Sequence, residues 1–151
     1  MMSISIKMNQ INQISRCQSL YRAEHLPISD LSPIHHTFVF AICKSPGLSQ
    51  EQIARRLCFN KSTVARRLTH LEEHGYITRI TDESDKRVML VYPTEKMLNI
   101  FPKVREISKE WNALVARDIS DCEMEIFLSV LERISHRAKE LVESEEGGTA
   151  N

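Results

Sequence analysis

Glycine is scarce in this chain, with only four among 151 residues. Two of them, Gly147 and Gly148, lie close to the last residue. Little is therefore left for the glycine-rich loops that cradle the phosphates of nucleotides. A G-x-S-x-G segment is also absent, and no pair of carboxylates stands in a context that suggests acid–base chemistry. The sequence therefore gives no support for an enzyme.

Cysteine pairs are likewise absent, because the four cysteines are scattered and none forms a C-x-x-C segment. We expect free thiols in a reducing cytoplasm, and packing roles for Cys43, Cys58 and Cys122. The first residues lack the basic start and apolar run of a signal peptide, and no apolar stretch approaches bilayer length. These absences predict a cytoplasmic protein with no membrane partner.

Histidines with metal-ligand spacing are few as well. His35 and His36 are adjacent, so they point to different sides of a helix and cannot chelate one ion together. His70 and His74 are four residues apart, a spacing that can hold a metal, but they fall on a helix that we expect to contact DNA. We expect neither a bound metal nor any other cofactor.

Net charge is zero, so no overall field of one sign announces a partner, but the charges are unevenly distributed. Arg55–Arg67 holds five basic residues and no acid, whereas nine acids stand against three basic residues from Asp118 onward. A balanced total thus hides a basic centre and an acidic tail.

Three helices are predicted before residue 59. Apolar spacing indicates the first over residues 4–25. Ser32 and Pro33 are good first residues for the second, because proline at the first helical position loses no hydrogen bond. Ser49 and Gln52 form the S-x-x-Q pattern of a capping box, which begins the third.

Residues 59–75 read FNKSTVARRLTHLEEHG and predict a fourth helix. Asn60 is a good N-cap, and Gly75 supplies the left-handed residue that commonly ends a helix. At about 100° per residue, one face is apolar and carries Val64, Leu68 and Leu71. The opposite face and its shoulders are polar and carry Ser62, Thr63, Arg66, Arg67, Thr69 and His70.

A hairpin follows, because Tyr76–Ile80 and Val88–Tyr92 are β-prone and a polar loop separates them. After the hairpin the helical pattern returns in a long segment that contains Pro102, and Asp121 is expected to cap a last helix. The predicted fold class is mainly α with a small β-wing: a winged helix-turn-helix domain plus N- and C-terminal dimerisation helices.

The whole chain, 1–151, is expected to form a single unit of organisation with two parts. Residues 32–93 form the winged-helix lobe, and residues 3–26 and 94–144 form the dimerisation helices. These terminal helices carry more apolar residues than a small winged-helix lobe can cover, which predicts a homodimer, although the helices could instead cover each other within one chain.

The second helix of a helix-turn-helix can enter the DNA major groove with its N-terminal residues on base edges. The groove is electronegative, which explains why this helix is basic in its first half and has its acids, Glu72 and Glu73, at the far end. Arg66 or Arg67 can bond a guanine with two hydrogen bonds. A solvated charged face is the alternative. The residues expected at double-stranded DNA are Asn60, Lys61, Ser62, Thr63, Arg66, Arg67, His70, Lys86 and Arg87.

Leu48–Val91 resembles the core of the MarR family of bacterial transcription regulators. The segment LEEHGYITR, Leu71–Arg79, matches the end of the family's recognition helix and its first wing strand. The wing tip DESDKR matches the family's D-x-R signature, here Asp85 and Arg87. The Thr-Glu-Lys that begins at Thr94 is similar to the SlyA-like branch.

The resemblance implies a homodimeric repressor that binds a pseudo-palindromic DNA site. It implies that Arg87 reaches into the minor groove and that Asp85 braces this arginine or the wing turn. It also implies control by a small lipophilic or phenolic ligand, for which we expect a pocket lined by His36, Phe38, Phe40, Trp111 and Leu114.

Two alternatives remain open at the level of sequence. Cys17 lies beside Arg16, which could lower its thiol pKa and make the protein a redox-sensing regulator of the same fold. The zero net charge and the acidic tail are also compatible with a winged-helix protein-interaction module that binds no specific DNA.

Overall fold

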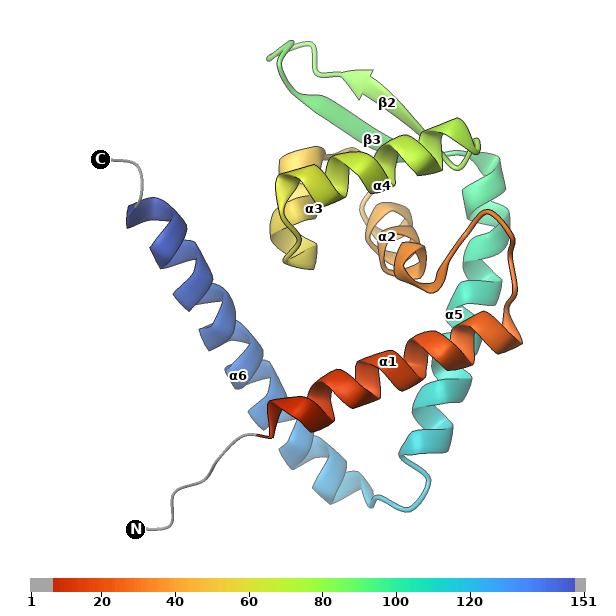
Figure 1. The fold of residues 1–151 in the computed structure, drawn as a ribbon, viewed down its shortest axis with the longest axis vertical. Helices are drawn as coiled ribbons and strands as arrows, with labels where there is room; N and C mark the ends of the chain where they lie inside the picture. Colours follow the sequence, from red (N-terminus) through yellow and green to blue (C-terminus); the bar gives the residue numbers. More distant parts are fainter. Residues whose placement is uncertain (1–6, 149–151) are drawn as a thin grey trace. The chain divides into compact units, whose positions relative to one another are not determined.

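The computed structural model describes residues 7–148, with side chains through residue 145 (Figure 1). Its elements are α1 (Met8–His25), α2 (Pro33–Lys44), β1 (Leu48–Ser49), α3 (Gln50–Leu57), α4 (Lys61–Glu73), β2 (Ile77–Thr81), β3 (Met89–Pro93), α5 (Glu95–Val115) and α6 (Asp121–Gly148). The fold is mainly α with a small antiparallel sheet, as the sequence predicts. Residues 4–6 of the predicted first helix, and residue 3 of the predicted dimerisation segment, lie outside the described residues.

Side-chain caps begin α2 and α3 as the sequence predicts. Pro33 is the first residue of α2, and Ser32 precedes it as the N-cap. At α3 the Gln52 N–H donates to Ser49 Oγ at 3.1 Å, and the Ser49 N–H donates to Gln52 Oε1 at 2.9 Å. These reciprocal bonds satisfy two of the backbone donors that every helix leaves open at its N-terminus.

Helix α4 is defined at both ends by local hydrogen bonds. Asn60 Oδ1 accepts from the Thr63 N–H at 2.8 Å. At the other end Gly75 has φ +77°, and the Tyr76 N–H donates to the Leu71 carbonyl at 2.8 Å. Glycine adopts this left-handed conformation without the steric cost that a Cβ brings, so α4 ends here and the chain turns into β2.

The sheet has the order β1-β3-β2, with antiparallel neighbours. Both wing strands begin one residue later than predicted. The two-residue strand β1 was not predicted; it pairs Leu48 with Val91 and Ser49 with Leu90, so that β3 lies between two neighbours. The hairpin β2–β3 forms the wing, and β2 packs along α4.

The chain divides into two compact units within α5, between Trp111 and Asn112. The first unit has one apolar core, shared by α2, α3, α4, the sheet and the first half of α5. Its most deeply buried members are Phe38, Val39, Ile53, Leu68, Leu71, Val91, Met97 and Val104.

The second unit contains α6, whose start differs from the prediction. Ser120 caps this helix in place of Asp121, because the Ser120 N–H donates to Glu123 Oε2 at 2.9 Å and the Glu123 N–H donates to Ser120 Oγ at 3.3 Å. Most apolar side chains of α6 are exposed within the single chain, including Ile126, Phe127, Leu128, Val130, Leu141 and Val142. None of the helices among the described residues is long and apolar enough to cross a bilayer.

Candidate nucleic-acid interface

The first turn of α4 presents a row of polar groups to solvent. Asn60 Oδ1 accepts both the Thr63 N–H and, at 2.9 Å, the Ser62 hydroxyl. The cap therefore orients the Ser62 side chain at the helix N-terminus, where the positive end of the helix dipole favours an anion. Asn60 and Ser62 are exposed and Thr63 is half-buried.

The basic side chains in the first half of α4 differ in their exposure to solvent. Arg66 is exposed, whereas Arg67 is half-buried and its Nε atom is enclosed without a hydrogen-bond partner among the described residues. Lys61 is 82% exposed, with its Nζ 3.8 Å from Glu51 Oε1 on α3. An ion pair this exposed contributes little, so Lys61 can exchange Glu51 for a phosphate.

The wing tip carries Arg87 in a defined orientation. Arg87 Nε donates to Asp85 Oδ1 at 3.0 Å and Nη2 donates to Asp85 Oδ2 at 3.1 Å. The Arg87 N–H also donates to Asp85 Oδ1, at 3.1 Å. These hydrogen bonds hold the pKa of the Asp85 carboxyl below its usual value. The Arg87 side chain is 90% exposed, so the charge is oriented and still accessible; Lys86 beside it is exposed too.

His70, which we expected at DNA, has its ring engaged within the protein. Its Nε2 donates to the Asp30 carbonyl at 2.7 Å. Its ring stacks on His35 with a centroid separation of 4.6 Å and lies 4.1 Å from the ring of His74. Nε2 of His70 is thus bonded within the protein and its ring contacts two other histidines, while its contact with DNA stays a prediction.

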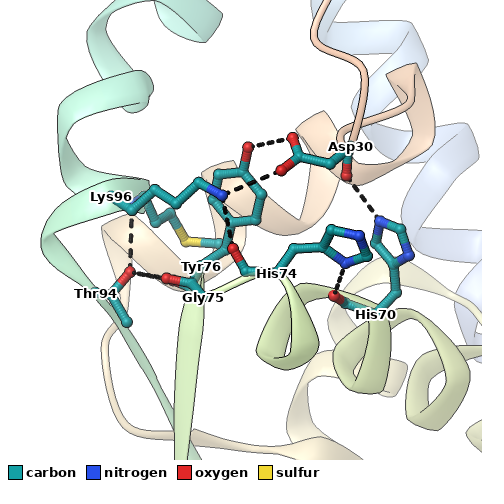
Figure 2. Close-up of polar contacts among 8 residues, drawn as sticks. Asp30, His70, His74, Gly75, Tyr76, Thr94 and Lys96 are labelled. Atoms are coloured by element: carbon teal, nitrogen blue, oxygen red, sulfur yellow. Dashed lines mark hydrogen bonds and ion pairs between the residues drawn. The ribbon is translucent and has the colours of Figure 1, made fainter.

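Asp30 and Lys96 anchor the C-terminal end of α4 (Figure 2). The Tyr76 hydroxyl donates to Asp30 Oδ1 at 2.6 Å, and Lys96 Nζ donates to Asp30 Oδ2 at 3.1 Å. Lys96 Nζ also donates to the His74 carbonyl at 2.7 Å and lies 4.1 Å from the Tyr76 ring centroid. The Tyr76 and Lys96 hydrogen bonds lower the pKa of Asp30, while burial and Asp30 raise the pKa of Tyr76.

Thr94 completes this anchor. Its hydroxyl lies 2.6 Å from the Gly75 carbonyl and 3.0 Å from the Tyr76 carbonyl, both of which can accept its proton. The segment that begins α5 therefore satisfies carbonyls that the end of α4 leaves open. Sequence patterns gave no signal for this anchor, because its partners come from three distant segments.

The residues of the expected ligand pocket lie in different surroundings. Phe38 is fully buried and stacks on Phe59, so it belongs to the core. Phe40 packs edge-on against Phe101, Trp111 lies near Tyr21, and Leu114 is exposed. A cavity of about 400 Å³ does exist elsewhere, lined by His25, Leu26, Pro102, Lys103, Glu106, Ile107 and Glu110.

His36, the remaining pocket residue, is 1% exposed and lies among polar groups of the first unit. Its Nδ1 and the Nε of Arg22 are both enclosed and have no hydrogen-bond partner among the described residues. Arg22 Nη2 donates to Ser108 Oγ at 3.2 Å. Burial lowers the pKa of Arg22, and burial together with Arg22 lowers the pKa of His36 to about 4.

The cysteines do not share one environment. Cys17 is exposed on α1, and Cys58 and Cys122 are exposed as well, so the expected packing role fails for the last two. Cys43 is half-buried against the core, and burial raises the pKa of its thiol to about 11. Cys58 has φ +55° in the turn between α3 and α4, a conformation that is uncommon outside glycine. In the described part of the chain, no three histidine, cysteine or acidic residues gather as a metal site.

Known proteins are similar to this chain in sequence and fold. A model of the MarR family matches residues 29–88. The uncharacterized HTH-type transcriptional regulator YybA of Bacillus subtilis strain 168 is 27% identical over 105 residues, which are 70% of this chain and 70% of that protein. The crystal structure of the transcriptional regulator SlyA is 28% identical with a TM-score of 0.83, over 90% of this chain and 96% of that one.

A putative MarR family regulator from Listeria monocytogenes, solved in complex with a 26mer DNA, has the same fold. It is 20% identical, with a TM-score of 0.87, and the match covers 98% of this chain and 99% of that one. YybA and SlyA are described as transcriptional regulators. By sequence and fold together, the chain is similar to the MarR family of helix-turn-helix transcriptional regulators.

Proposed function

We propose that this regulator binds double-stranded DNA sequence-specifically, with the first half of α4 in the major groove and the wing in the adjacent minor groove. The observation that carries the proposal is the exposed, basic N-terminal half of α4 beside a wing arginine that Asp85 holds in place. The Listeria monocytogenes protein of the same fold, solved with DNA, supports it.

Within this proposal the side chains have different tasks. Arg66, exposed and one turn into α4, reads a base edge, and Arg67 supports it from the shoulder of the helix. Lys61 and Lys86 neutralise phosphates. Arg87 enters the minor groove, whose negative potential attracts arginine. The smaller polar groups at the helix start, Asn60, Ser62 and Thr63, bond phosphate or base edges from the N-terminus of α4.

We propose that two copies form a homodimer through their terminal helices. Among the described residues, α1 exposes Met8, Ile11, Ile14 and Leu20, and α6 exposes a longer apolar series that includes Phe127 and Leu128. Exposed apolar side chains in such number usually mark an interface. A second copy of the chain is the occupant, because a two-fold pair of α4 helices matches a pseudo-palindromic site. Such a dimer represses by covering DNA that polymerase needs.

We also propose that the effector is a small lipophilic anion held by Arg22. Arg22 is half-buried and its Nε is enclosed, so its guanidinium needs negative charge or further acceptors. The described residues supply Arg22 with one hydroxyl, that of Ser108. A carboxylate or phenolate would satisfy the enclosed Arg22 Nε, and neutral His36 would bond it from α2. Titration with benzoate should give binding that Arg22→Met abolishes. Equal binding of benzamide, the neutral match, would contradict an anion site.

The DNA proposal is tested by selecting duplexes from a random library with the full chain. Fluorescence anisotropy then compares the selected duplex with a scrambled one of the same composition. We expect the selected duplex to bind at least about a thousandfold more tightly, with affinity falling steeply as salt rises. Similar dissociation constants of about 10⁻⁴–10⁻⁶ M for both duplexes would indicate non-specific binding and favour a protein-interaction module.

A further inference from the structure

Arg79, on β2, connects three elements through one side chain. Its Nε donates to Glu72 Oε2 at 3.1 Å and its Nη2 donates to Glu72 Oε1 at 2.9 Å, a two-pronged ion pair with α4. Its Nη1 donates to Gln50 Oε1 at 2.9 Å on the first residue of α3, and Nη2 lies 3.4 Å from Thr69 Oγ1. We call these four residues the Arg79 clamp.

The clamp is partly sheltered from water, since the side chain of Arg79 is 18% exposed and that of Glu72 is 40% exposed. Hydrogen bonds from Arg79 lower the pKa of Glu72, and the bonds to Glu72 raise the pKa of Arg79, so both stay charged at neutral pH. The planar guanidinium can bond the Glu72 carboxylate and the Gln50 amide together, whereas a lysine ammonium has no such fork.

The clamp lies between the two parts that the proposed function brings to DNA. Thr69 and Glu72 follow directly after the half of α4 that carries Arg66. Arg79 stands opposite Val91 in the sheet, on the strand that runs out to the wing tip. Its guanidinium is turned toward α3 and α4, so it holds the helix and the wing strand at a fixed separation.

We propose that Arg79 is a positioning residue for DNA recognition, setting α4 against the wing so that Arg66 and Arg87 reach their grooves together. The inference rests on the proposed DNA-binding function. Base hydrogen bonds depend strongly on distance and angle, whereas phosphate contacts are less directional and carry no sequence information. Loss of the clamp should therefore reduce discrimination between sequences more than it reduces non-specific binding.

The test compares Arg79→Gln, Arg79→Lys and Glu72→Gln with Arg105→Gln, which removes the same charge from an exposed position on α5. Each full-length variant is titrated with the selected and the scrambled duplex by fluorescence anisotropy. We expect Arg79→Gln to lower the affinity ratio about tenfold, as loss of one good base contact would. Arg105→Gln should leave the ratio unchanged, and Arg79→Lys should recover part of it.

Glu72→Gln separates positioning from simple electrostatics. It makes the protein more positive, so a charge effect alone would strengthen binding to both duplexes. Positioning instead predicts a loss of discrimination like that of Arg79→Gln. Tighter binding of Glu72→Gln to both duplexes, with a salt slope reduced by about one in Arg79→Gln, would overturn the inference and make Arg79 a phosphate contact.

Hydrogen exchange provides a readout that needs no DNA. Amides of 69–73 and 77–81 should exchange faster in Arg79→Gln than in Arg105→Gln, and unchanged exchange would overturn the clamp. If the wild type does not discriminate between duplexes, the proposed function fails and the inference with it. If the wild type discriminates and Arg79→Gln does so equally well, only the inference fails.

Discussion

The stability of the first unit should fall as the medium becomes acidic, because two histidines are buried in neutral form. His35 and His36 are 3% and 1% exposed. Burial, reinforced mainly by His70 and Arg67, lowers the pKa of His35 to about 4, and burial with Arg22 does the same for His36. The Ser32 N–H donates to His35 Nδ1 at 3.1 Å, so the single proton of the neutral ring sits on Nε2.

The direction of this pH dependence follows from how many protons the folded and the unfolded chain bind. Between pH 6.5 and pH 4 the unfolded chain binds a proton at each histidine and the folded chain does not, so stability is present above this window and is lost as pH falls through it. From pH 6.5 down to pH 5 the free energy of unfolding falls by about 1.4 kcal/mol per pH unit over about 1.5 units, or about 2 kcal/mol per histidine. Two histidines give about 4 kcal/mol, a large part of the roughly 5–15 kcal/mol that stabilises a typical domain.

The assay is urea unfolding followed by circular dichroism at pH 7.5, 6.5, 5.5 and 5.0, at one protomer concentration because dimerisation adds to apparent stability. His36→Leu should lose about half of the pH dependence, since one of the two titrating rings is gone. His136→Gln, at an exposed position of α6, should keep all of it. The slope of unfolding free energy against pH could stay unchanged in His36→Leu, or wild-type stability could rise on acidification. Either result would show that the neutral buried histidines do not set the pH dependence.

Two further predictions concern the dimer and the anchor of α4. Phe127→Glu, which places a charge in the apolar series of α6, should shift the protein toward monomer in sedimentation velocity; a dimer that survives unchanged would remove α6 from the interface. Lys96→Met should lower unfolding free energy by roughly 1 kcal/mol more than Lys103→Met on the same helix, because it breaks the bonds to Asp30 and the His74 carbonyl. Equal effects of both changes in a denaturant titration would mean that the Lys96 contacts contribute nothing.

Local signals allowed much of the fold to be predicted. The S-x-x-Q pattern at Ser49 and the polar cap Asn60 act within one turn, and Gly75 has the positive φ that its position at a helix end implies. The start of α6 was misplaced by one residue for a reason of the same kind. Glu123 lies three residues after Ser120, a capping-box spacing that points to Ser120 rather than Asp121.

Contacts between distant segments could not be predicted from one sequence. Asp30 and Lys96 are 66 positions apart, and neither residue lies in a sequence pattern that predicts contact with the other. β1 is two residues long, too short to show alternation. One signal for the clamp was available: strand alternation puts Arg79 on the same face as buried Ile77, and an inward arginine requires a partner.

The central claim is that the first half of α4 reads base pairs. The most direct test is to repeat the duplex selection with Arg66→Ala and compare the selected sequences with those of the wild type. In Arg66→Ala we expect the sequence preference to disappear at one base position in each of two half-sites, with centres about 10 base pairs apart, while preferences elsewhere in the site persist. Selected sequences that do not differ between Arg66→Ala and the wild type would contradict this claim.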